Sequence, residues 1–269
     1  MRRLSGTVFT YSAGVTLVCM RVYVGCCGFC VGRSKYFSTF RTVELQETFY
    51  ELPPVERLSS LCELGGRGFV FNMKAWQGVT HSLDSPTWRR ARWRPPEELR
   101  DRVGLLRPTR ENLELWNEVV KRARAIGARV IVLQTPPSFG FSEENFRNAR
   151  EFLRTVATGE FAIGWEPRGG WLERLEYVRR VVEISDSVIH VVDPFRSKPA
   201  VEKEVGYFRL HGIGSGEVNY RYKYTDEDLA RLCEFVRGTS SREVYVMFNN
   251  VWMLQDAQRF RDICHDVVV

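Results

Sequence analysis

The sequence has no apolar run long enough to cross a bilayer as a helix, so we expect no membrane partner. It lacks the Gly-x-Gly-x-x-Gly and P-loop signatures of nucleotide-binding sites. It contains no low-complexity tract, no solenoid repeat and no linker rich in glycine, serine or proline that would divide it. Only four of its 269 residues are histidines, which leaves few ligands for a transition metal.

The composition is that of an ordinary globular protein, with 44% hydrophobic and 27% charged residues. The formal net charge of +6 favours anionic partners, either a small anionic substrate or nucleic acid. Arginine greatly outnumbers lysine, a bias reported for thermophilic proteins in some families. Seven cysteines without regular spacing do not form a secreted disulfide framework, so we expect a reducing, cytoplasmic location.

Apolar strands alternate with helical patterns along most of the chain. Thr109, Ser142 and Thr225 are predicted to cap three of the helices. This alternation predicts a parallel sheet wrapped by helices, and eight such units in this length predict a closed (β/α)8 TIM-like barrel of one domain. The predicted strands are 21–25, 43–46, 69–74, 129–134, 161–166, 188–192, 206–211 and 243–248.

The barrel is predicted to comprise residues 20–269. Residues 1–19 resemble nothing that follows and are predicted to be a poorly packed N-terminal extension. Met20, directly before the first strand, offers an alternative start of translation.

Polar side chains lie at or just past the predicted strand ends, where the active sites of such barrels are found. One interpretation is that they only hold the barrel mouth together by ion pairs and hydrogen bonds. A polar network of this size more often surrounds a ligand, because unpaired buried charge is costly. We expect catalytic roles for Glu44, Glu166, Asp193 and His211, and substrate-binding roles for Lys74, Gln134, Arg168, Arg209, Asn249 and Asn250.

The alternation of side chains along a strand gives this site an expected geometry. Arg209 and His211 share one face of their strand, and Glu166 and Arg168 share one face of theirs. Alternate strands contribute to the same interior layer of a barrel. We therefore expect Glu166 and Arg209 to form a salt bridge, with Arg168 and His211 one step higher at the rim.

Several motifs have the pattern of one family. They are Val43-Glu44 through Thr48-Phe49-Tyr50, Phe69 and Phe71 with Lys74 and Val79-Thr80-His81, Leu133-Gln134 with Pro136-Pro137-Ser138-Phe139, Glu166-Pro167-Arg168 with Trp171, Tyr207 with Arg209 and His211-Gly212, and Val244-Tyr245-Val246 with Phe248-Asn249-Asn250. In these motifs the chain resembles the YecE-like family, catalogued as domain of unknown function 72, from about Val22 to Arg259. The resemblance implies a TIM-like barrel and supplies no established activity.

Two classes of function stay open. The first is an enzyme that uses Glu166 or His211 as acid or base on a phosphorylated or carboxylated substrate, held by Lys74, Arg168 and Arg209. The second is a nucleic-acid-binding module that uses the same cationic face and the arginine-rich segment 84–110. That segment has eight arginines against four carboxylates, a net charge of +4, with two interleaved tryptophans. A solvated segment paired with nearby carboxylates is the favoured interpretation of it.

Metal binding is the less favoured alternative, and no cofactor is predicted. Glu44, Glu166, Asp193 and His211 could hold a divalent cation, but three nearby cationic side chains would oppose it. Cys26, Cys27 and Cys30 resemble half of a zinc site. The second cysteine pair is missing, and Cys264 with His265 would lie at the opposite end of the barrel. We interpret the three cysteines as small buried thiols that bind no metal.

Overall fold

A computed structural model describes residues 20–269 and contains a closed parallel barrel of eight strands. Each strand pairs with the next in the sequence, and β8 pairs with β1 from Arg21–Glu243 to Cys26–Phe248. The (β/α)8 fold and the closure between the first and last strands are confirmed. The strands are β1 (Arg21–Cys27), β2 (Thr42–Leu45), β3 (Val70–Lys74), β4 (Ala128–Gln134), β5 (Ala162–Glu166), β6 (Val188–Val192), β7 (Val205–Leu210) and β8 (Glu243–Phe248).

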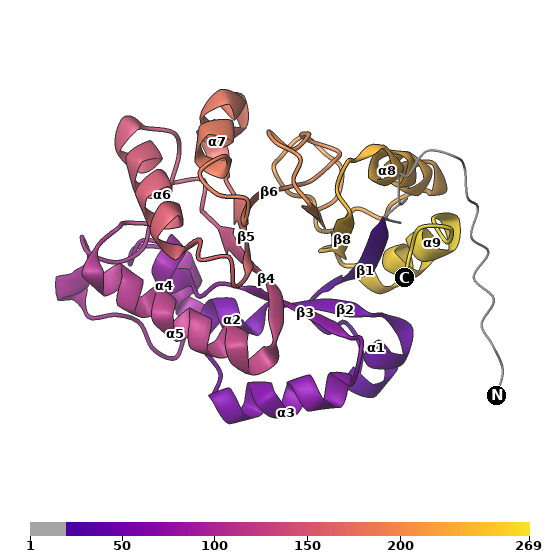
Figure 1. The fold of residues 1–269 in the computed structure, drawn as a ribbon, viewed down its shortest axis with the longest axis horizontal. Coiled ribbons are helices and arrows are strands. Elements are labelled where there is room, and N and C mark those ends of the chain that lie inside the picture. The colour runs from indigo at the N-terminus through magenta and orange to yellow at the C-terminus, as the bar shows by residue number, and fades with distance from the viewer. Residues whose placement is uncertain (1–19) are drawn as a thin grey trace, which may run out of the picture.

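Helices surround the barrel, and Figure 1 shows α8 and α9 beside each other where the chain returns to β1. The predicted caps are present: the side chains of Thr109 and Ser142 accept from backbone N–H groups three residues on, and Thr225 forms a capping box with Asp228. The helices are α1 (Arg33–Thr39), α2 (Glu47–Tyr50), α3 (Val55–Gly65), α4 (Gln77–Thr80), α5 (Arg110–Ile126), α6 (Glu143–Val156), α7 (Leu175–Val182), α8 (Asp226–Gly238) and α9 (Met253–Ile263), with 3-10 turns at Pro86–Arg90, Glu97–Leu99 and Gly169–Glu173.

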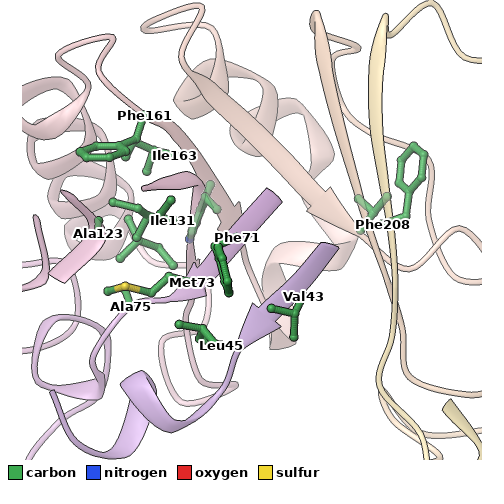
Figure 2. Close-up of a cluster of buried hydrophobic side chains, with 14 of the residues drawn as sticks. Val43, Leu45, Phe71, Met73, Ala75, Ala123, Ile131, Phe161, Ile163 and Phe208 are labelled. Atoms are coloured by element: carbon green, nitrogen blue, oxygen red, sulfur yellow. The ribbon is translucent and has the colours of Figure 1, made fainter. Parts of the chain in front are cut away.

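The strands separate two hydrophobic clusters. Val43, Leu45, Phe71 and Met73 belong to the outer cluster, between the strands and the helices (Figure 2). Because side chains alternate along a strand, Glu44 projects from the opposite face of β2. The inner cluster fills the barrel with Cys27, Val130, Val132, Ala162, Ile189, Val191, Val205, Tyr207, Tyr245 and Met247. The barrel interior is therefore a packed core rather than an open channel.

The end of the barrel at the strand N-termini has its own ion pair. Glu243 accepts hydrogen bonds from Arg129 Nε and Nη2 at 3.1 and 3.0 Å, and Tyr245 donates its hydroxyl to the same carboxylate. Polar groups at this face of such barrels serve stability. The candidate site must therefore be sought at the opposite face.

A disulfide joins Cys233 on α8 to Cys264, directly after α9. The spacing of the cysteines gives no sign of this bond, because the two residues are 31 apart and meet only when α8 and α9 pack together. The sequence predicts no disulfide framework, and among residues 20–269 this bond is a single link between two helices. In the part of the chain that the structure describes, the other cysteines are free.

The predicted extension at residues 1–19 lies outside the described residues. Among residues 20–269, no helix combines the length and the apolar character needed to cross a membrane.

Candidate active site

Arg209, near the end of β7, is the centre of a buried charge network. It has no exposed surface. Its Nε and Nη2 donate to the two carboxylate oxygens of Glu44 at 3.0 and 2.9 Å, and its Nη1 donates to Glu166 Oε2. Gln134 Oε1, at the end of β4, accepts a further bond from Nη1 at 3.3 Å. The expected Glu166–Arg209 salt bridge is confirmed, and Arg209 has no surface left for a ligand.

Glu44 is equally enclosed. Besides Arg209, it accepts hydrogen bonds from the Tyr207 hydroxyl at 2.8 Å and from the Gln46 amide. Burial and the nearby Glu44 carboxylate raise the pKa of Tyr207 well above its ordinary value, so the phenol stays a donor. The Glu44 side chain has no exposed surface. It fixes the position of Arg209 and is shielded from any substrate.

Arg168 and His211 form the rim of the network. Arg168 Nε donates to Glu166 Oε1 at 2.9 Å, and its Nη2 lies 3.1 Å from His211 Nε2. This contact confirms the expected arrangement of the two side chains at the rim. Burial alone would raise the pKa of Glu166, but the guanidinium groups of Arg168 and Arg209 outweigh it and lower that pKa well below its ordinary value. Glu166 is therefore a fixed anion.

His211 is held as a neutral imidazole. Burial lowers its pKa. Because arginine can only donate, Nε2 accepts from Arg168 and we assign the proton to Nδ1, which faces Asp193 Oδ2 at 3.8 Å. Asp193, just past β6, also accepts from the backbone N–H of His211 at 2.9 Å and of Phe195 at 3.1 Å. The lone pair that His211 would need as a base is already engaged.

Lys74, the last residue of β3, differs from the arginines of the site. Among residues 20–269, no carboxylate oxygen lies within 4.0 Å of its ammonium group. Its Nζ lies 3.9 Å from the centre of the Phe49 ring, and the residue keeps 8% of its surface exposed. Burial, followed by the charge of Arg209, lowers the pKa of Lys74 to about 7. A large fraction of the protein therefore has a neutral amine here at neutral pH.

The two asparagines after β8 differ in exposure and in hydrogen bonding. Asn249 is partly exposed, and its backbone N–H donates to the Leu210 carbonyl at 2.9 Å. The Asn250 side-chain amide donates to the Tyr222 carbonyl at 2.8 Å and to Asp256 Oδ2 at 2.7 Å. Asn250 thereby links the loop after β7 to α9, and its donors are occupied within the protein.

A small pocket opens between the ends of β5, β6 and β7, with a volume of about 40 Å³. It is lined by Glu166, Pro167, Arg168, Leu172, His190, Val191, Val192, Asp193, Arg196, Ser197, His211 and Glu217. Among residues 20–269, Arg196 Nε is buried without a hydrogen bond, at 3.8 Å from Asp193 Oδ2, and Arg168 Nη1 lies 3.8 Å from Glu217 Oε2. Each guanidinium group thus has one nitrogen at this pocket whose distance to a carboxylate exceeds that of a hydrogen bond.

Sequence reasoning missed Arg196, Glu217 and His190. Arg196 and Glu217 belong to loops after β6 and β7, and no strand pattern places such residues. Gly212, with φ of +83°, turns the second loop so closely that a Cβ there would lie 2.1 Å from the Asn219 carbonyl oxygen. His190 faces the helix layer, where its Nδ1 accepts from the Ala200 N–H at 3.0 Å.

The arginine-rich segment 84–110 is largely paired with carboxylates. Arg92 contacts Glu51, Arg94 and Arg100 contact Glu97, Arg100 also contacts Asp84, Arg102 contacts Glu111, and Arg110 contacts Glu114. Trp88 is buried, whereas Trp93 is 59% exposed and stacks on Trp76 with ring centres 5.4 Å apart. These contacts agree with the interpretation as a solvated, ion-paired segment.

A family model described as "Protein of unknown function DUF72" matches residues 33–267. The chain belongs to the DUF72 family. Two solved DUF72 family proteins have the same fold. The protein from Enterococcus faecalis V583 is 20% identical with a TM-score of 0.69, over 91% of this chain and 98% of that chain. The protein from Thermotoga maritima MSB8 is 24% identical with a TM-score of 0.62, over 91% and 99%.

The DUF72 barrel is also similar to barrels outside the family. D-psicose 3-epimerase from Clostridium cellulolyticum H10 is 12% identical with a TM-score of 0.54, over 92% of this chain and 99% of that chain. At these identities the likeness concerns the fold alone. No curated protein matches the chain.

The site of this DUF72 protein divides into fixed and available groups. Glu44, Glu166 and Arg209 saturate one another, so they hold the mouth in place. Lys74 has a pKa lowered to about 7 and no carboxylate oxygen within 4.0 Å among residues 20–269, and Arg196 Nε makes no hydrogen bond within the same residues.

The carboxylates of Glu44 and Glu166 in the DUF72 site are paired with arginine side chains rather than arranged around a metal ion. Among residues 20–269, no three ligand atoms from Glu44, Glu166, Asp193 and His211 lie within 4.8 Å of one another. The divalent-metal alternative therefore requires these side chains to rearrange.

Proposed function

We propose that this DUF72 protein is an enzyme that acts by general acid/base chemistry on a small phosphorylated or carboxylated substrate. Lys74 is the group that exchanges a proton with the substrate, and Arg168 and Arg196 bind the anionic end. The observation that carries the proposal is the unpaired Lys74 amine beside a network in which Arg209 is saturated by Glu44 and Glu166.

The pKa of about 7 suits Lys74 for proton transfer in both directions. A catalytic group works best when its pKa lies near the operating pH, because both protonation states are then populated. Glu166, which the sequence suggested as acid or base, is kept ionised by Arg168 and Arg209. Its role in the proposal is to position these two guanidinium groups.

The anionic end of the substrate is assigned to the pocket between β5, β6 and β7. Among residues 20–269, the buried Nε of Arg196 makes no hydrogen bond and has Asp193 Oδ2 at 3.8 Å, and a buried donor without a hydrogen bond is costly unless a ligand satisfies it. A pocket of about 40 Å³ takes a small group such as a carboxylate. A nucleic-acid role gains no comparable support, because most arginines of segment 84–110 already have partners.

Proton transfer can be tested before the substrate is known. The protein is incubated in D₂O with a panel of small phosphorylated and carboxylated compounds, and NMR detects any compound that gains deuterium at carbon. We expect exchange with the wild type, loss of exchange with Lys74→Met, and retention with Lys223→Met. Lys223 is a matched control because it is an exposed lysine whose ammonium also lies over an aromatic ring, 5.0 Å from the centre of Trp252.

Anion binding is tested separately by thermal unfolding. Phosphate, sulfate or small carboxylates should raise the melting temperature of the wild type by mass action, and Arg196→Met should lose this response. A wild type that ignores all three anions would remove the pocket from the proposal. Exchange that survives Lys74→Met would remove Lys74 as the proton-transferring group.

A further inference from the structure

Two thiols lie close together where β1 leaves the barrel. Cys26 Sγ and Cys30 Sγ are 3.7 Å apart. Gly28, with φ of +103°, makes the turn between them, and its N–H donates to the Cys26 carbonyl at 3.0 Å. A disulfide has an S–S distance of about 2 Å, so forming the bond must bring the two sulfur atoms closer together.

The two cysteines differ in their surroundings. Cys26 is fully buried on the outer face of β1, whereas Cys30 is partly exposed in the loop. The hydrogen bond with Cys26 lowers the pKa of Cys30, and burial raises the pKa of Cys26. The thiolate is the reactive form of cysteine, and an accessible thiol next to a buried one has the arrangement of an attacking and a resolving cysteine. Cys27 lies between them in sequence, but it belongs to the cluster inside the barrel.

We propose that Cys26 and Cys30 form a dithiol site that reacts with small-molecule disulfides of the glutathione type. The Cys30 thiolate attacks one sulfur of the disulfide, forms a mixed disulfide and releases the first thiolate. Cys26 then attacks the Cys30 sulfur, forms the Cys26–Cys30 bond and releases the second thiolate, which takes up the proton of Cys26. The protein dithiol is oxidised by two electrons, and one disulfide is reduced to two thiols.

The turn at Gly28 lies beside Gln46, since a Cβ built on Gly28 would lie 3.6 Å from the Cγ of Gln46. Gln46 in turn donates to Glu44, the carboxylate that holds Arg209. The dithiol site stands on its own geometry and does not depend on the proposed function.

The test uses the full chain with Cys19→Ser and Cys62→Ser, so that Cys26, Cys27 and Cys30 are the thiols that remain beside the Cys233–Cys264 bond. This protein is incubated with oxidised glutathione, and intact mass with peptide mapping reports the products. We expect the loss of two hydrogens and no bound glutathione. Adding Cys26→Ser should instead leave one glutathione on Cys30, because the resolving thiol is gone.

Two further variants distinguish this pair from its neighbour. Cys30→Ser should show neither an adduct nor a loss of hydrogens, whereas Cys27→Ala should behave like its parent. Circular dichroism confirms that each variant is folded. The proposal is overturned if the parent keeps its thiols under these conditions, or if Cys30→Ser is still oxidised.

Discussion

Replacing Lys74 by methionine should stabilise the protein at neutral pH. The unfolded chain keeps this lysine protonated up to its ordinary pKa of 10.5, whereas the folded protein lowers that pKa to about 7. Between these two pH values the unfolded state binds more protons, so this lysine makes the free energy of unfolding rise with pH. Methionine fills a similar volume without carrying a charge into the barrel mouth.

The size of the effect follows from the two pKa values. Each pKa unit corresponds to about 1.4 kcal/mol, so the lysine destabilises the folded protein by about 4 kcal/mol near pH 7, relative to pH values above its ordinary pKa. The cation–aromatic contact with Phe49 is lost in the variant and offsets part of the gain. Between about pH 7 and about pH 9, the advantage of Lys74→Met over the wild type should shrink by about 2 kcal/mol.

Urea unfolding followed by tryptophan fluorescence measures both quantities. The comparison uses the difference between variant and wild type, because the buried tyrosines titrate equally in both. Lys223→Met is the control. At either pH, its free energy of unfolding should be nearly the same as that of the wild type. A Lys74→Met variant that is no more stable than the wild type, with a difference that does not change with pH, would refute the reasoning.

Three other sets of substitutions test the framework of the barrel. Arg209→Met should lower the free energy of unfolding by about 3–5 kcal/mol, since it leaves buried carboxylates without their partner. Adding Glu44→Gln should recover part of this loss. Urea titration measures both variants, and a single variant as stable as the wild type would contradict the network. Thr225→Ala should cost about 1 kcal/mol by removing the cap of α8, and an unchanged urea midpoint would speak against the capping box. Replacing Cys233 and Cys264 together by alanine should cost about 4 kcal/mol for a sequence separation of 31, and equal melting with and without the bond would count against it.

The barrel could be predicted from the sequence because its strands are short apolar runs between well-marked helices. β6 and β8 have the predicted bounds, and the others differ by at most two residues. α1, α2 and α4 could not be predicted, because helices of seven or four residues carry too little periodicity to distinguish them from loops.

The sequence predicts that the polar residues of the candidate site lie at strand ends, but it does not predict all of the ion pairs among them. Alternation along β5 and β7 is enough to bring Glu166 and Arg209 together. The contact between Arg209 and Glu44 depends on how the closed barrel staggers its strands, since β2 and β7 are far apart in sequence. The lack of a carboxylate partner for Lys74 among residues 20–269 depends on the same stagger, because Glu44 and Glu166 are paired with Arg209 instead.

The most direct test of the account is a titration of Lys74 itself. Reductive methylation with ¹³C-formaldehyde labels the lysines, and the signal absent from Lys74→Arg identifies the Lys74 resonance in the wild type. We expect a titration midpoint near the pKa of about 7. A midpoint at the ordinary lysine value of about 10.4 would contradict the claim that the barrel mouth holds a lysine ready for proton transfer at neutral pH.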